Sequence, residues 1–149
     1  MYIVSACLLG ANCKYNGGNN DNEDVKDFCE GHRIMTVCPE TEGGLSSPRP
    51  PAEQQGEKVV DCEGKDVTAE FRKGAEICLQ KVLDSGEEPE LAVLKANSPS
   101  CGSCFVYDGT FTGTLTRGDG IFAGLIKAHG IRVLTEKDIS ETTVKELKK

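Results

Sequence analysis

Residues 2–8 read YIVSACL, an apolar and β-branched run that ends before Gly10. A short run of this kind next to a turn residue predicts a buried β-strand. Three further segments predict strands: RIMTVC at 33–38, LAVLK at 91–95 and IRVL at 131–134. Because strands that are buried on both faces read as apolar runs, this set predicts an α/β fold with a mainly parallel sheet and helices on its faces.

The segments between these strands supply the predicted helices. Residues 68–85 have the clearest helical periodicity, and residues 118–129 predict another helix. Asn22 or Asp24 can cap an earlier helix that ends at Gly31. Residues 137–149 are expected to form a C-terminal helix or tail, with Ser140 as the N-cap of a helix over 140–149.

Two segments do not fit this alternation. Residues 39–56 are rich in Pro, Gly and Ser, and a loop of that length is usually functional or disordered. Residues 58–67 predict a hairpin that turns at Glu63–Gly64. Since 149 residues are about the length of one domain, we expect a single domain over residues 1–149.

Charge and hydropathy argue against several classes of partner. The chain has 17 Lys and Arg against 24 Asp and Glu, a net charge of -7, which weighs against binding to polyanionic nucleic acid. No apolar run approaches the roughly 20 residues of a membrane span, so no membrane partner is expected. The first strand begins at Tyr2 and leaves no room for a secretory signal, so we expect a cytoplasmic protein.

The chain has eight cysteines, and in a reducing cytosol they are not expected to form structural disulfides. Cys29 and Cys78 lie on apolar helical stripes and are expected to pack in the core. Cys62 lies near the predicted hairpin tip, where no role is evident.

Three other cysteines follow predicted strands. Cys7, Cys38 and Cys101 lie at or just after strand ends, and in a parallel sheet these ends meet at the edge where ligands bind. Three explanations stay open at this point. Structural zinc prefers four ligands, although only Cys101 and Cys104 have the usual pair spacing. A redox dithiol of the same two residues normally opens a helix, but residues 105–113 have strand and turn character. An iron–sulfur cluster usually has four cysteine ligands, and three would leave one iron open.

A set of short motifs in a fixed order resembles the 2-thiouracil desulfidase family, over about residues 2–136. These motifs are SACLLG at 5–10, CKYNG at 13–17, CPE at 38–40, GGL at 43–45, PRPPAE at 48–53, GKDVT at 64–68, LKANSPSCG at 94–102 and YDGTF at 107–111.

This resemblance implies a Rossmann-like, three-layer α/β domain that carries a 4Fe–4S cluster. The implied ligands are Cys7, Cys38 and Cys101, with one iron open. The implied substrate is a small thiolated pyrimidine: a 2-thiouracil-like base, its nucleoside or its nucleotide. The reaction replaces C=S by C=O, releases sulfide and needs no net electron transfer.

Within the same motifs, Glu40 matches the catalytic acid–base of the family and Ser98 matches its active-site serine. Ser98 can hydrogen-bond the substrate or a tetrahedral oxyanion, or it can stabilise the turn before Pro99. Cys13 is expected to be an additional thiol at the site and not a ligand.

Two further parts of the long loop are candidates for substrate binding. Arg49 can hold a nucleotide phosphate or pair with Glu53. Gly43 and Gly44 permit a close backbone approach to a ligand, or they form an ordinary turn.

Overall fold

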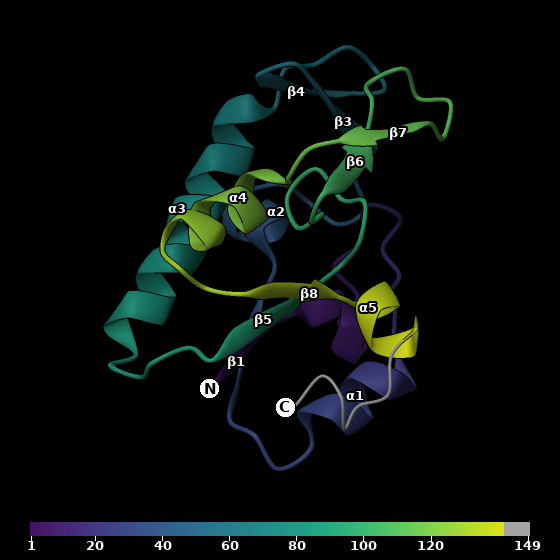
Figure 1. The fold of residues 1–149 in the computed structure, drawn as a ribbon. Coiled ribbons are helices and arrows are strands. Elements are labelled where there is room, and N and C mark those ends of the chain that lie inside the picture. Colours follow the sequence, from purple (N-terminus) through teal and green to yellow (C-terminus); the bar gives the residue numbers. More distant parts are fainter. Residues whose placement is uncertain (142–149) are drawn as a thin grey trace.

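A computed structural model describes residues 1–141 of the chain, and a sheet of four parallel strands lies at its centre (Figure 1). The strand order is β2-β1-β5-β8. In register, Tyr2 stands opposite Ile34 on one side and opposite Leu91 on the other. The bounds are β1 Tyr2–Ser5, β2 Ile34–Val37, β5 Leu91–Leu94 and β8 Val133–Thr135. The four predicted strands and their parallel arrangement are confirmed.

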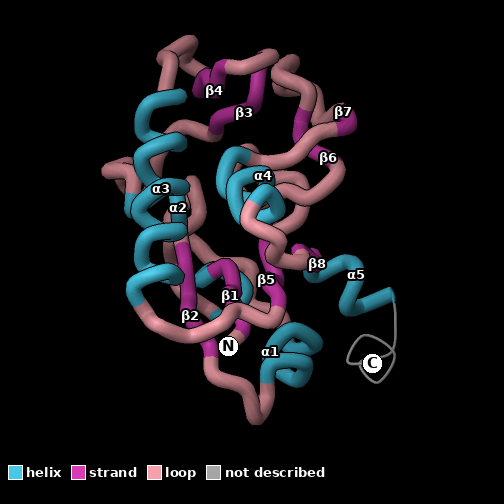
Figure 2. Tube along the Cα trace, turned by 60° about the vertical axis from the view of Figure 1, so that its left-hand side comes forward, coloured by secondary structure: helices cyan, strands magenta, loops and turns pink. Residues whose placement is uncertain are grey.

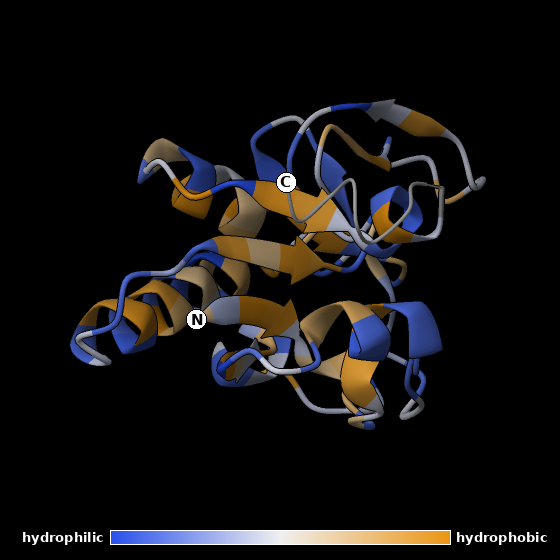
Figure 3. Cartoon of the chain, turned by 60° about the horizontal axis from the view of Figure 1, so that its bottom comes forward, coloured by the Kyte–Doolittle hydropathy of each residue, from blue (hydrophilic) through white to orange (hydrophobic). Residues whose placement is uncertain are grey.

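Helices cover both faces of this sheet. The bounds are α1 Glu23–Cys29, α2 Pro39–Glu42, α3 Thr68–Asp84, α4 Ile121–Ala128 and α5 Glu136–Glu141. Ile3 and Leu94 pack with α3 and α4 in one core cluster, whereas Val4 and Val93 pack with α1 and α5 in another. Neighbouring residues of one strand therefore serve opposite faces, and the three predicted layers are present. Figure 3 shows apolar strands between helices that carry both hydrophobic and hydrophilic residues.

Helix ends follow the local sequence, with one correction. The Asn22 side chain accepts a hydrogen bond of 3.0 Å from the Val25 amide, so Asn22 is the cap of α1. At the other end of the described chain, Ser140 lies inside α5 and does not cap a helix. The reciprocal bonds between Thr135 and Asp138 start that helix earlier than predicted. The rest of the predicted helix, residues 142–149, lies outside the described residues.

The prediction of a hairpin within residues 58–67 is wrong about which segment pairs with its first strand. Its first strand, β4 (Lys58–Asp61), pairs antiparallel with β3 (Ala52–Gln55) across a turn at Gly56. The turn near Gly64 exists, but only one bridge, between Val60 and Asp66, closes it. The end of the long loop is therefore a strand.

A second hairpin pairs β6 (Phe105–Tyr107) with β7 (Leu115–Arg117). Figure 2 shows both hairpins at the same end of the molecule. One hairpin follows β2 in the chain and the other follows β5. Both therefore lie beyond the carboxyl ends of the parallel strands, where the candidate site lies. Among residues 1–141, no helix is both long and apolar enough to cross a membrane.

Candidate active site

The loops after three parallel strands meet at one cavity. Cys7 lies in η1 (Ala6–Leu9), the 3-10 turn after β1, Cys38 follows β2, and Cys101 lies in the loop after β5. All three line a cavity of about 690 Å³, a typical size for a small-molecule site. From β1 the chain continues to β2 on one side of the sheet, and from β5 it continues to β8 on the other side. The cavity therefore lies at the topological switch point between β1 and β5. The structure brings the three strand-end cysteines together, as predicted.

A tight contact between two helices positions the Cys38 loop. Cys38 precedes α2, which starts at Pro39. A side chain at Gly43 would meet the Glu70 carbonyl oxygen at 1.9 Å, and one at Gly74 would meet the Pro39 oxygen at 1.6 Å. The backbones of α2 and α3 therefore touch. The close approach that Gly43 was expected to offer a ligand is made to α3, while Gly44 lines a smaller, neighbouring cavity.

The Cys101 loop is built on Ser98 and on the start of α4. Ser98 Oγ accepts hydrogen bonds of 3.1 Å from the amides of both Ser100 and Cys101. The first amides of α4 donate to the carbonyl oxygens of Pro99 and Ser100. Ser98 thus has the turn-stabilising role that was weighed for it, and it also lines the cavity.

The thiols at the cavity differ in the proton affinity that their surroundings impose. Hydrogen bonding to the Cys13 side chain, whose one proton can serve either thiol, lowers the pKa of Cys38 and of Cys7 against the effect of burial, with Thr41 assisting at Cys38 and Asn20 at Cys7. The same contacts raise the pKa of Cys13 itself. Because the thiolate is the form that binds metal, this arrangement favours Cys7 and Cys38 as ligands and keeps the proton on Cys13.

Cys101 has a different environment. Burial raises the pKa of its thiol, and a hydrogen bond from Ser5 opposes that effect. Only 4% of the residue is exposed. A metal bound at Cys101 would have to displace a proton from a dry site, and the Ser5 hydroxyl is placed to stabilise the resulting thiolate.

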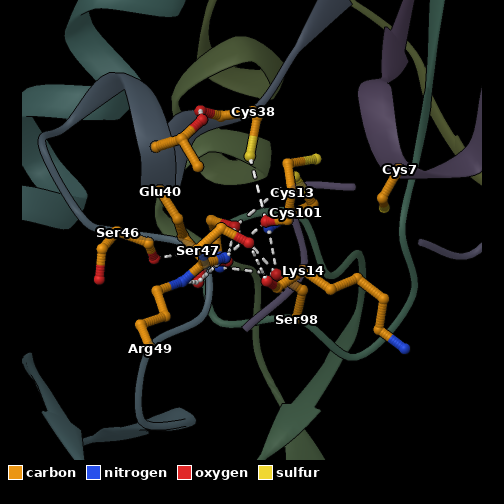
Figure 4. Close-up of polar contacts among 12 residues, drawn as sticks. Cys7, Cys13, Lys14, Cys38, Glu40, Ser46, Ser47, Arg49, Ser98 and Cys101 are labelled. Carbon is orange, nitrogen blue, oxygen red and sulfur yellow. Dashed lines mark hydrogen bonds and ion pairs between the residues drawn. The ribbon is translucent and has the colours of Figure 1, made fainter. Parts of the chain in front are cut away.

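Glu40 and Arg49 form an ion pair at the cavity wall. Arg49 Nη2 lies 3.1 Å and Nε 3.2 Å from Glu40 Oε1, and the side chains are only 7% and 17% exposed. The guanidinium also donates to the carbonyl oxygens of Cys13 and Ser46. The partner of Arg49 is therefore Glu40 and not Glu53, whose carboxylate binds the amides of Gly109 and Phe111. Figure 4 shows the pair beside the cavity thiols.

Sequence reasoning missed Ser100, the residue that connects Glu40 with Ser98 and Cys101. Ser100 Oγ donates to Glu40 Oε2 at 2.8 Å and lies 2.9 Å from Ser98 Oγ and 3.6 Å from Cys101 Sγ. Its position in the SPSC run next to Cys101 was a usable signal, but the sequence does not show which of the two serines faces Glu40.

The structure also places the cysteines that were not predicted to be ligands. Cys29 and Cys78 are buried in the two core clusters, as predicted. Cys62 lines the cavity although no role was assigned to it. Cys104 is exposed and its sulfur lies 3.9 Å from Lys127 Nζ. It is not among the residues that line the cavity with Cys101.

Two lysines near the site also differ from each other. Lys95 lines the cavity, and its ammonium group pairs with Glu136 at 2.9 Å. Lys14 lines the cavity, and its Nζ lies 6.0 Å from the centre of the Tyr15 ring. In Figure 4 its side chain extends away from the Glu40–Arg49 pair.

The donor set fits an iron–sulfur cluster better than a single metal ion. Among the described residues, no three His, Cys, Asp or Glu side chains are arranged to hold one ion. In a cubane cluster each cysteine binds a different iron, so the thiols have to surround a space and need not converge on one point. Cys7, Cys38 and Cys101 line one shared cavity, and thiolates are the ligands that such clusters use.

The fold and the site define an α/β protein with a cysteine-lined cavity at the switch point of a parallel sheet. Comparison with known proteins makes the class specific. A family model described as 2-thiouracil desulfurase matches residues 2–138. The chain belongs to this family.

Two similar proteins extend nearly over the whole chain. The uncharacterized protein YbbK of Bacillus subtilis (strain 168) is 38% identical over 153 residues, which cover 95% of this chain and 99% of YbbK. A solved structure of TudS, described as a 4Fe–4S-dependent thiouracil desulfidase, is 42% identical with a TM-score of 0.86. That match covers 99% of this chain and 98% of the TudS chain. The α/β architecture is thus confirmed independently.

Proposed function

We propose that this protein is a 4Fe–4S-dependent desulfidase that converts the C=S group of a small thiolated pyrimidine to C=O and releases sulfide. The observation that carries this proposal is the meeting of three strand-end thiols and the Glu40–Arg49 pair at one cavity. The family and the similarity to TudS support the cluster and the class of substrate.

Cys7, Cys38 and Cys101 would hold the cluster. When bound, the cluster supplies an open, thiophilic iron as a Lewis acid for the thione sulfur. Cys13 stays protonated beside two of the ligands, and its one S–H proton can be donated to the sulfur of either of them. Such a bond orients the ligand and reduces its negative charge without adding a fourth ligand.

Glu40 serves as the acid–base group. Arg49 binds Oε1 twice and fixes the carboxylate, so Oε2 is the oxygen that can take up a proton. Ser98 shapes the ligand loop and lies at the cavity with it. The attacking water gives its proton to this group of side chains, because a neutral water is a poor nucleophile.

The apolar part of the cavity lining suits a planar ring. It includes Tyr107, Phe111, Pro51 and Ala52, whose apolar faces can cover a pyrimidine while its polar edge meets Ser100 and Glu40.

The test is sulfide release from 2-thiouracil by protein that is reconstituted with iron and sulfide in the absence of oxygen. We expect about four irons per chain, absorbance near 400 nm, and equal amounts of sulfide and uracil. A fully folded protein that binds no iron under these conditions would overturn the proposal.

A further inference from the structure

The two serines beside Cys101 differ in how their hydrogen-bonding capacity is used. A hydroxyl has one proton to donate and two lone pairs that accept. Ser98 Oγ accepts from the amides of Ser100 and Cys101, each at 3.1 Å, so both of its lone pairs are used. Its remaining contact, 2.9 Å from Ser100 Oγ, has to use its proton.

The direction of the next bond follows in the same way. An ionised carboxylate only accepts, so Ser100 donates its proton to Glu40 Oε2 at 2.8 Å. Ser98 must therefore donate to Ser100, and the chain runs in one direction, from Ser98 to Ser100 to Glu40. Arg49 holds the other carboxylate oxygen, which leaves Oε2 as the end of the chain.

Ser100 keeps one unused lone pair. Its other close neighbour is Cys101 Sγ at 3.6 Å, and a cysteine bound to iron is a thiolate with no proton to donate. Ser98 has no capacity left for a substrate or a water, whereas Ser100 has one acceptor position and lies at the cavity.

We propose that Ser100 is the hydroxyl that takes the proton of the attacking water and passes its own proton to Glu40, and that Ser98 is a positioning residue which fixes the Ser100 hydroxyl. This inference rests on the proposed desulfidase function and assigns the proton path within it.

The step balances without a further reactant. The water oxygen bonds to the carbon of the C=S group as one of its O–H bonds breaks. That proton forms a bond to Ser100 Oγ while the original Ser100 proton moves to Glu40 Oε2. When the C–S bond breaks, its electron pair leaves with the sulfur. The proton returns from Glu40 through Ser100 to give hydrosulfide, and the second water proton goes to solvent.

The test is Ser100→Ala in anaerobically reconstituted protein. We expect iron and labile sulfide per chain equal to those of the wild type, a kcat lowered about 100-fold and a KM within about two-fold, because a positioned proton-transfer group contributes to the transition state and not to binding. In mixtures of light and heavy water, kcat of the wild type should depend on deuterium content along a curve, since two protons move together. The dependence should become linear in Ser100→Ala.

Two further variants separate this path from a structural role. Ser103→Ala makes the same change three residues along the loop, at a hydroxyl whose contact is the Cys104 sulfur, and should keep wild-type kcat. Ser100→Thr retains the hydroxyl and should recover kcat to within about ten-fold of the wild type. Loss of iron from Ser100→Ala, or an iron-loaded Thr variant as slow as the Ala variant, would show that Ser100 only supports the ligand loop and would overturn the inference. Failure of the wild type itself to release sulfide would instead reject the proposed function.

Discussion

Cys78 and Cys38 are the same residue type in two regions of the molecule, and everything around them differs. Cys78 lies in α3 with no exposed surface, and burial raises the pKa of its thiol to about 12. Cys38 lies at the cavity, where hydrogen bonds from Cys13 and Thr41 lower the pKa of its thiol. In the core the thiol is a small apolar body, whereas at the end of the sheet it is a potential thiolate. Thiol chemistry in this chain is therefore set by the neighbours that the fold provides.

The most severe test of this contrast is to remove one thiol from each region. Cys38→Ser should lose most of the bound iron and at least 100-fold in sulfide release, since hydroxyl is a poor ligand for the cluster. Cys78→Ala should keep the iron and lose about 1–2 kcal/mol of unfolding free energy from the core. Iron analysis and thermal unfolding measure the two outcomes. Equal iron content in both variants would remove Cys38 from the ligand set.

A smaller effect is expected from two carboxylates on α2. Glu40→Gln should keep the cluster and lower kcat about 100-fold, because the amide cannot accept the proton. Glu42→Gln is the matched control, since Glu42 pairs with Lys81 and does not line the cavity. Its kcat should stay within about two-fold of the wild type. Full activity of Glu40→Gln would reject its assignment as the acid–base group.

The close contact between α2 and α3, which positions the Cys38 loop, can be tested with substitutions at two glycines. Gly74→Ala places a Cβ against the Pro39 carbonyl, and we expect a loss of about 3 kcal/mol of unfolding free energy together with reduced iron binding. Gly124→Ala has only the Asp119 Cβ at 3.7 Å, so it should be neutral or stabilise α4 by about 0.5 kcal/mol. Denaturant unfolding gives both values. A neutral Gly74→Ala would mean that α2 can move away from α3 without harm to the site.

The smallest effect is expected at the exposed thiol. Cys104→Ser should change neither iron content nor kcat by more than about two-fold, because Cys104 lies outside the cavity. A thiol–disulfide enzyme of Cys101 and Cys104 would behave in the opposite way and lose all turnover. Activity of this variant with 2-thiouracil decides between the two interpretations.

The sheet and the strand-end thiols could be predicted from the sequence because both depend on local signals. Apolar β-branched runs mark β1 and β5, and a cysteine at the end of such a run or in the loop after it lies at the carboxyl edge. The pairing of β3 with β4 was missed because AEQQ at 52–55 has no strand-like composition. Its register depends on the neighbouring strand and not on its own residues.

The contacts inside the site depend on distances across the fold. Arg49 could pair with Glu40 or Glu53 on sequence grounds, and only the packing of the long loop against α2 decides for Glu40. The bond from Ser100 to Glu40 joins residues 60 positions apart. No periodicity or motif carries information of that kind. The positions of Ser98 and Ser100 in the hydrogen-bond chain to Glu40 could therefore be assigned only from the structure.

The wide separation of Cys7, Cys38 and Cys101 along the chain also limits when the proposed centre can be assembled in the cell. Strands β1, β2 and β5 pair over long stretches of sequence, and pairing of that kind is slow compared with the formation of local structure. A nascent chain that ends before β5 has two of the three proposed thiols and neither serine. If these three thiols hold the cluster as proposed, its insertion has to follow the synthesis of β5 and of the loop that carries Cys101.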